Sequence, residues 1–188
     1  MTNLIKKTMP LAAVLFMTAC GNNGGSDTKD AGHEGHDTAA ATETQAAPQP
    51  AAGPVALKDD GLNAVYQHYL HLSTALVNAD VAEAKVASNA IEAGAATVEG
   101  GASIAASAAK ITAASDIETQ RAAYSKLSND MIALVKKSGV SNGELYVEYC
   151  PMAFDDKGAS WLSSSKEIRN PYFGDKMLTC GEVKETIK

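Results

Sequence analysis

The sequence is 188 residues long and carries a formal charge of −6 at pH 7. A chain this acidic is a poor candidate for binding nucleic acid, and anionic lipid head groups would repel it. The sequence has no Cys-x-x-Cys redox motif, no Gly-rich phosphate loop and no Gly-x-Ser-x-Gly elbow. No base stands beside a nucleophile, so we expect a protein without catalytic residues.

The first residues have the features of an export signal. Lys6 and Lys7 precede an apolar run over residues 11–16, which is too short to span a bilayer. Residues 17–20 (Met-Thr-Ala-Cys) resemble the lipobox of bacterial lipoproteins, in which the signal is cut before a cysteine that is then lipidated. We therefore expect residues 1–19 to be a lipoprotein signal peptide and Cys20 to be the lipidation site; an ordinary secretory signal is the alternative. This predicts a location in the cell envelope, lipid-anchored and facing the periplasm or the cell surface.

Residues 20–54 form a low-complexity stretch rich in Gly, Ala, Thr, Asp and Pro. It contains no large apolar residue and cannot bury a core, so we predict a flexible tether. Within it, His33 and His36 are three residues apart and are secondary candidates for metal binding. Such a pair is more often a polar piece of linker.

A folded domain is expected over residues 55–188, and its first half has helical periodicity. Asp80 with Glu83, and Ser115 with Glu118, resemble capping boxes at the starts of a second and a fourth helix. An Ala-rich third helix is expected over Ser103–Thr112. In the first helix, apolar residues recur at spacings of three and four: Leu62, Val65, Tyr66, Tyr69, Leu72 and Leu76.

Short Ala-rich helices are not stable alone, so they must pack against one another. We predict a mainly α fold, a small up-down bundle of about four helices. The C-terminal part differs, because Leu145, Val147 and Tyr149 alternate with Tyr146 and Glu148 in a pattern typical of a strand. We expect a β-rich or irregular cap packed on the bundle.

Two short segments of this cap hold soft metal ligands. Cys150 and Met152 flank Pro151, and Met177 precedes Cys180 by three residues. Thiols and thioethers together favour Cu(I). Pro151 disfavours a helical conformation for Cys150, and residues two apart in extended chain project to the same side, so Cys150 and Met152 are expected to face one space. Met177 and Cys180 share a side only if the chain turns between them.

The cysteines could instead form a disulfide. If Cys20 carries lipid, Cys150 and Cys180 are the pair left in an oxidising compartment. A bond between them would close a loop of ~30 residues and stabilise the fold by ~3–4 kcal/mol in the chain-entropy model. The methionines would then be ordinary core filler. Both interpretations require the two cysteines to lie close together.

Several motifs resemble one family. They are Tyr149–Phe154 (Tyr-Cys-Pro-Met-Ala-Phe), Gly158–Ser163, Ile168–Gly174 (Ile-Arg-Asn-Pro-Tyr-Phe-Gly) and Met177–Gly181 (Met-Leu-Thr-Cys-Gly). They resemble an uncharacterised bacterial domain family, of unknown function, found in Bacteroidota lipoproteins. The family also occurs fused to periplasmic adaptor subunits of copper/silver-type heavy-metal efflux pumps. The resemblance implies a context of metal handling.

The residues and the resemblance lead to one functional expectation. We expect an envelope lipoprotein that binds a soft metal, Cu(I) above all, for buffering, delivery or sensing. Its ligands would be Cys150, Met152, Met177 and Cys180. The alternative is a structural or partner-binding domain pinned by a Cys150–Cys180 disulfide and associated with a heavy-metal efflux adaptor. Contact with the membrane would be through the lipid anchor alone.

Overall fold

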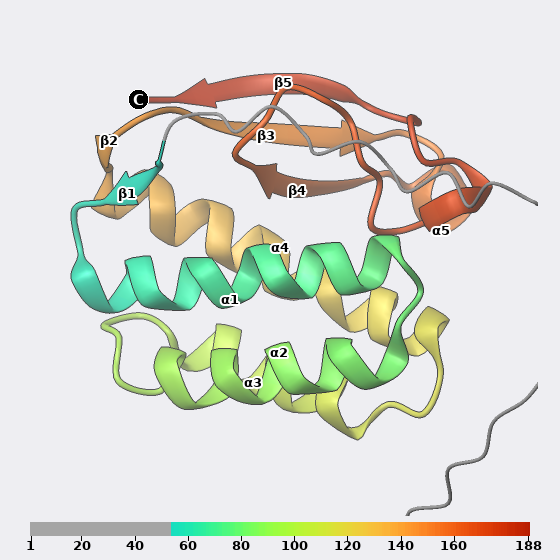
Figure 1. The fold of residues 1–188 in the computed structure, drawn as a ribbon, viewed down its shortest axis with the longest axis horizontal. Coiled ribbons are helices and arrows are strands. Elements are labelled where there is room, and N and C mark those ends of the chain that lie inside the picture. The colour runs from blue at the N-terminus through green and yellow to red at the C-terminus, as the bar shows by residue number, and fades with distance from the viewer. Residues whose placement is uncertain (1–53) are drawn as a thin grey trace, which may run out of the picture. The chain divides into compact units, whose positions relative to one another are not determined.

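A computed structural model describes residues 54–188. The predicted signal peptide, the lipidation site Cys20, the predicted tether up to residue 53 and the histidines His33 and His36 lie outside the described residues. The helices and strands follow one another in the order shown in Figure 1. They are β1 (Ala56–Leu57), α1 (Asp60–Val77), α2 (Val81–Ala95), α3 (Ala102–Ala113), α4 (Ile117–Ser138), β2 (Val140–Asn142), β3 (Leu145–Cys150), α5 (Ala153–Asp156), β4 (Ala159–Ser163), the 3-10 turn η1 (Gly174–Lys176) and β5 (Glu182–Ile187).

The four long helices form the predicted bundle. Each packs against the next along the chain, and α1 also contacts α4. The predicted apolar face of the first helix is confirmed, since every one of its six residues is buried: Leu62, Val65, Tyr66, Tyr69, Leu72 and Leu76. In Figure 1, α1 and α4 lie next to the sheet, and α2 with α3 form the layer farther from it. None of the helices in residues 54–188 is long and apolar enough to cross a membrane.

Aspartate side chains cap the starts of α1, α2 and α4, whereas α3 begins after Gly101 without a side-chain cap. The Asp80 carboxylate accepts the Glu83 N–H at 2.9 Å, as the capping box predicted. The predicted Ser115 cap of α4 is wrong, because Asp116 takes that position and accepts the Thr119 N–H at 2.8 Å. Asp116 is itself extended, so the helix begins one residue later than a Ser115 cap would allow. This backbone bond also lowers the pKa of the Asp116 carboxyl.

The predicted C-terminal cap is an antiparallel sheet with the strand order β4-β3-β5. Strand β3 is central, with Tyr149 opposite Ser160 on β4 and opposite Glu182 on β5. A separate two-stranded ribbon joins β1 to β2. Both alternating sets of β3 side chains are buried, because the strand is covered on both faces; Leu145 and Glu148 are each 0 % exposed. The cap is therefore integral to the core rather than an appendage.

Arg121 connects the bundle to the cap. Its side chain is 3 % exposed, and it donates to the Pro171 and Leu76 carbonyl oxygens, each at 2.9 Å. It also pairs with Glu118 one turn earlier on α4, at 3.2 Å. Gly174 packs directly on this arrangement, since a Cβ there would lie 2.5 Å from the Val77 carbonyl oxygen. A single guanidinium thus joins α1, α4 and the loop before η1.

We expect Arg121→Met to lower the free energy of unfolding by about 2 kcal/mol, because it leaves the buried Pro171 carbonyl without a donor and takes one of two donors from the Leu76 carbonyl, which keeps the Ala79 N–H. Urea unfolding of the purified protein measures this. Lys126→Met is the matched control on the same helix, because the Lys126–Asp130 pair is at the surface and its loss should cost less than about 0.5 kcal/mol. Equal losses for the two variants would contradict the bridging role of Arg121.

Candidate metal centre

The two cysteines meet at one end of the sheet. Cys150 is the last residue of β3 and is 0 % exposed, whereas Cys180 lies just before β5 and is half-buried. Both are free thiols, and their Sγ atoms are 2.8 Å apart. The expectation that they lie close together is confirmed. The antiparallel pairing of β3 with β5 explains it, because Tyr149 opposes Glu182 and the residues just beyond this pair are brought face to face.

The loop that carries Cys180 is held by Asn170, which is 0 % exposed. Its side-chain amide donates to the Cys180 carbonyl oxygen at 2.8 Å, and its backbone N–H donates to the Leu178 carbonyl at 2.8 Å. Gly181 lets this loop pass close to the sheet: its φ is 146°, and a Cβ there would lie 2.9 Å from the Trp161 ring. Asn170 and Gly181 therefore set the position of Cys180.

The thiol of Cys180 is hard to ionise. The hydrogen bond with the Cys150 thiol, followed by burial, raises the pKa of Cys180 to about 11, and a backbone N–H of Met152 opposes the shift. The thiol of Cys180 is therefore protonated at neutral pH. Because thiolates rather than thiols bind metals, uptake of a metal ion here must release that proton.

The two methionines lie in the turns next to the cysteines. Strand β3 ends at Cys150, and Met152 has φ −87° and ψ −8°, so the expected extended run from Cys150 to Met152 is wrong. The Met152 side chain is 47 % exposed. Met177 is half-buried, and its carbonyl oxygen accepts the Cys180 N–H at 3.1 Å, which is the turn that Met177 and Cys180 required. In residues 54–188, hydrogen bonding joins the two thiols and involves neither thioether sulfur.

The turn after Met152 is strained. Phe154, Asp155 and Asp156 have φ values of 55°, 56° and 61°, so three consecutive non-glycine residues are left-handed. Each such residue costs about 1–2 kcal/mol, and strain of this kind is concentrated at functional sites. Met152 and Phe154 also line a cavity of about 320 Å³ together with Phe173. The carboxylate residues Glu118 and Asp155 line the same cavity, so its wall is mixed in polarity.

No other ligand cluster accompanies the cysteines. Among residues 54–188, no group of three or more His, Cys, Asp or Glu side chains could hold a metal ion. A metal at the cysteine pair would therefore take its remaining ligands from methionine, backbone or water. Asn170 was not foreseen from the sequence, and the available signal was Asn170-Pro171, which marks a turn without revealing what the amide holds.

The comparisons with known proteins concern the bundle. Residues 65–143 match the model of a family described as "Protein of unknown function (DUF3347)". Nothing among the curated proteins or the solved structures matches the chain. The match runs from α1 to just past β2 and ends before Cys150. The resemblance expected from the motifs is confirmed to this extent: the chain contains an uncharacterised domain of unknown function.

Proposed function

We propose that this protein binds a soft metal ion, Cu(I) above all, through the thiolates of Cys150 and Cys180. Met152 and Met177 complete the set of sulfur ligands from the adjoining turns. The role is buffering, delivery or sensing of the metal, and the chemistry is ligand exchange rather than catalysis. Soft sulfur donors without imidazole or carboxylate partners suit Cu(I) better than Zn(II).

The contact between the two thiols carries this proposal. Side chains that are 30 residues apart in the sequence meet at 2.8 Å in a partly buried position. Each is within three residues of a methionine. A metal–thiolate bond is about 2.3 Å long for zinc, so two sulfurs on one ion stand well over 3 Å apart in any open geometry. Metal binding must therefore spread the two thiols.

The same contact also favours a second candidate function. A disulfide has an S–S distance of about 2.05 Å, so the thiols need only approach slightly to form one. The protein would then be a structural or partner-binding domain whose C-terminal sheet is pinned across the end of β3. The two candidates differ in what the methionines do, since thioethers act as ligands in the first and as packing in the second.

The cellular setting is part of the proposal. The lipobox-like residues 17–20 support a lipid anchor at Cys20, with the domain facing the periplasm or the cell surface. The resemblance to domains of Bacteroidota lipoproteins and efflux adaptors supports a partner in heavy-metal efflux. Such a partner would receive or supply the metal by exchange of sulfur ligands.

Replacing both Met152 and Met177 by leucine should weaken Cu(I) binding at least about tenfold, while nearly preserving side-chain volume. The measurement is a competition titration against a Cu(I) chelator under reducing conditions. The chain carries Cys20→Ser throughout, so that Cys150 and Cys180 are the only thiols. Zn(II) binding, measured in parallel, should be weaker than Cu(I) binding and insensitive to the double change.

Met131→Leu is the matched control, because Met131 is 0 % exposed in the bundle, on α4. It should leave Cu(I) affinity unchanged. Equal Cu(I) affinity for the starting protein and the double-leucine variant would exclude methionine ligation. If the reduced protein takes up no Cu(I), the result would favour the second candidate function, a structural or partner-binding domain.

A further inference from the structure

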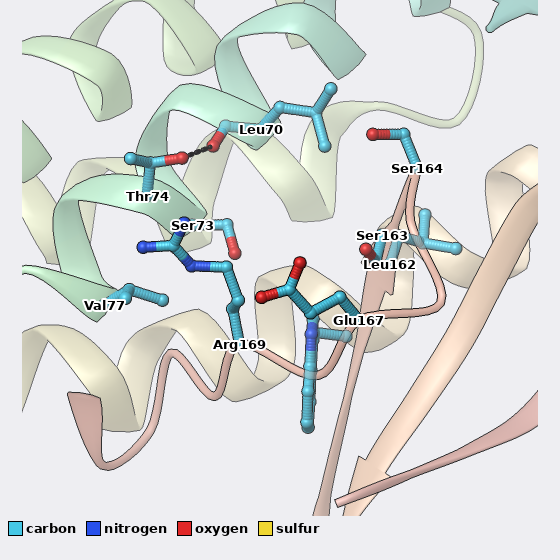
Figure 2. Close-up of a pocket in the computed structure, with 10 residues that line it drawn as sticks. Leu70, Ser73, Thr74, Val77, Leu162, Ser163, Ser164, Glu167 and Arg169 are labelled. Atoms are coloured by element: carbon cyan, nitrogen blue, oxygen red, sulfur yellow. Dashed lines mark hydrogen bonds between the residues drawn. The ribbon is translucent and has the colours of Figure 1, made fainter. Parts of the chain in front are cut away.

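A second cavity lies away from the cysteine pair, between α1 and the segment that runs from β4 into the following loop. Figure 2 shows it, and its volume is about 250 Å³. Pockets for drug-sized ligands span about 300–1,000 Å³, so an occupant of this one is smaller than those. Its apolar wall is formed by Leu70, Val77 and Trp161.

Two opposite charges line this cavity. Arg169 and Glu167 both face it from the loop after β4. In the part of the chain that the structure describes, neither the guanidinium nor the carboxylate makes a hydrogen bond or an ion pair, even with the other. The other arginine, Arg121, is by contrast fully engaged through the contacts given above.

The two charged groups stand near each other in the cavity without forming an ion pair. In Figure 2 the Arg169 guanidinium lies beside α1, close to Ser73, whereas the Glu167 carboxylate points into the space between α1 and β4. Hydroxyl groups of Ser73 and Ser164 stand on opposite sides. A guanidinium is a bidentate donor suited to a carboxylate, and a carboxylate suits an ammonium group.

We propose that this cavity binds a small zwitterion of the α-amino acid class. Arg169 holds the ligand carboxylate, Glu167 holds the ligand ammonium, and the ligand side chain packs on the wall that includes Leu70. A simple anion would be repelled by Glu167 and a simple cation by Arg169, so a ligand that carries both charges fits best. This site uses none of the sulfur ligands and is independent of the proposed metal binding.

The test uses Trp161 as its reporter, because it is the only tryptophan in the chain and lies in the cavity wall. Fluorescence and thermal shift of the metal-free protein are followed while amino acids are added up to the millimolar range. Leucine, serine and glutamine form the panel. Isopentylamine and 4-methylpentanoate are the matched probes for leucine without its carboxylate and without its ammonium group. We expect a saturable response to at least one amino acid and none to the two single-charge probes.

Substitutions of the two charged residues test whether each one contacts the amino acid. Arg169→Gln and Glu167→Gln should each weaken amino-acid binding by at least about tenfold, as expected for a charged hydrogen bond. Lys166→Gln, a charge change in the same loop at a residue that does not line the cavity, should leave it unchanged. No response to any amino acid, an equal response to a single-charge probe, or full binding by Arg169→Gln would each overturn the proposal.

Discussion

Serine at both Cys150 and Cys180 should remove nearly all Cu(I) uptake by the reduced protein. A hydroxyl is a hard and weak donor, so the two best ligands of the proposed site would be lost together. The competition titration in the Cys20→Ser background measures this. We expect a loss larger than that of the double-leucine variant, because the thiolates carry charge and the thioethers do not.

The same variant separates metal binding from a structural disulfide. Under oxidising conditions a Cys150–Cys180 bond would stabilise the fold by about 3–4 kcal/mol over the double-serine variant, through loop closure in the unfolded chain. Under reducing conditions the two proteins should unfold at similar denaturant concentrations. Native mass spectrometry adds the two-dalton difference of a disulfide and the mass of bound copper. Copper uptake by the double-serine variant equal to that of the starting protein would contradict the proposed ligands.

The second large effect concerns Glu148, a carboxyl in the middle of β3. It is 0 % exposed, and neither carboxyl oxygen is in hydrogen-bonding geometry with a partner in the described residues. Burial raises the pKa of Glu148 to about 8, although the nearby side chains of Trp161 and Ser163 oppose the shift. The folded protein therefore holds this group in its protonated form at neutral pH.

The direction of the pH dependence follows from that shift. The raised pKa of the folded state means that the contribution of protonated Glu148 to stability is complete below the ordinary glutamate pKa of 4.5. That contribution is lost progressively as the pH rises through the folded pKa, to a total of up to about 5 kcal/mol. Glu148→Gln is neutral at every pH, so its advantage in free energy of unfolding over the wild type should grow from about pH 5 to about pH 8.

Urea unfolding of the reduced, metal-free protein across that pH range measures this difference. Glu185→Gln is the matched control, because Glu185 is on the neighbouring strand β5 and forms an exposed pair with Lys136. Its pH profile should run parallel to that of the wild type. A Glu148→Gln profile parallel to the wild type would show that the buried carboxyl does not titrate as its surroundings require.

The helical half was predictable because the faces of its helices follow simple periodicity. The start of α4 was misplaced by one residue because Ser115 and Asp116 are both good caps, and the choice depends on the direction from which the chain enters the helix. Local sequence signals define the ends of a helix less well than its existence. On α1 the apolar spacing identified buried residues correctly, whereas the burial of Gln120 and Arg121 on α4 had no signal in the sequence.

One feature of the site was predictable from the sequence. Cys150 and Cys180 were expected to lie close together, because both a disulfide and a shared metal ion require it. The turn at Met152 was missed because the extended preference that Pro151 imposes on Cys150 does not fix the residues after the proline. Glu148 alternates with apolar neighbours like the solvent-facing residue of a strand. Its burial depends on contacts between residues far apart in the sequence, such as its pairing with Val183 on β5.

The position of β5 has a consequence for the order in which the protein assembles. Each long helix packs against its neighbour in the chain, so the bundle can form from local contacts while synthesis continues. Strand β5 comes after the other elements of residues 54–188 and must return to pair with β3, and Cys180 emerges 30 residues after Cys150. A chain that stalled before Glu182 could build its helices and still leave Cys150 without the strand that holds its partner in place. Stable pairing of the two thiols therefore requires that synthesis has passed β5 and that β5 has joined β3.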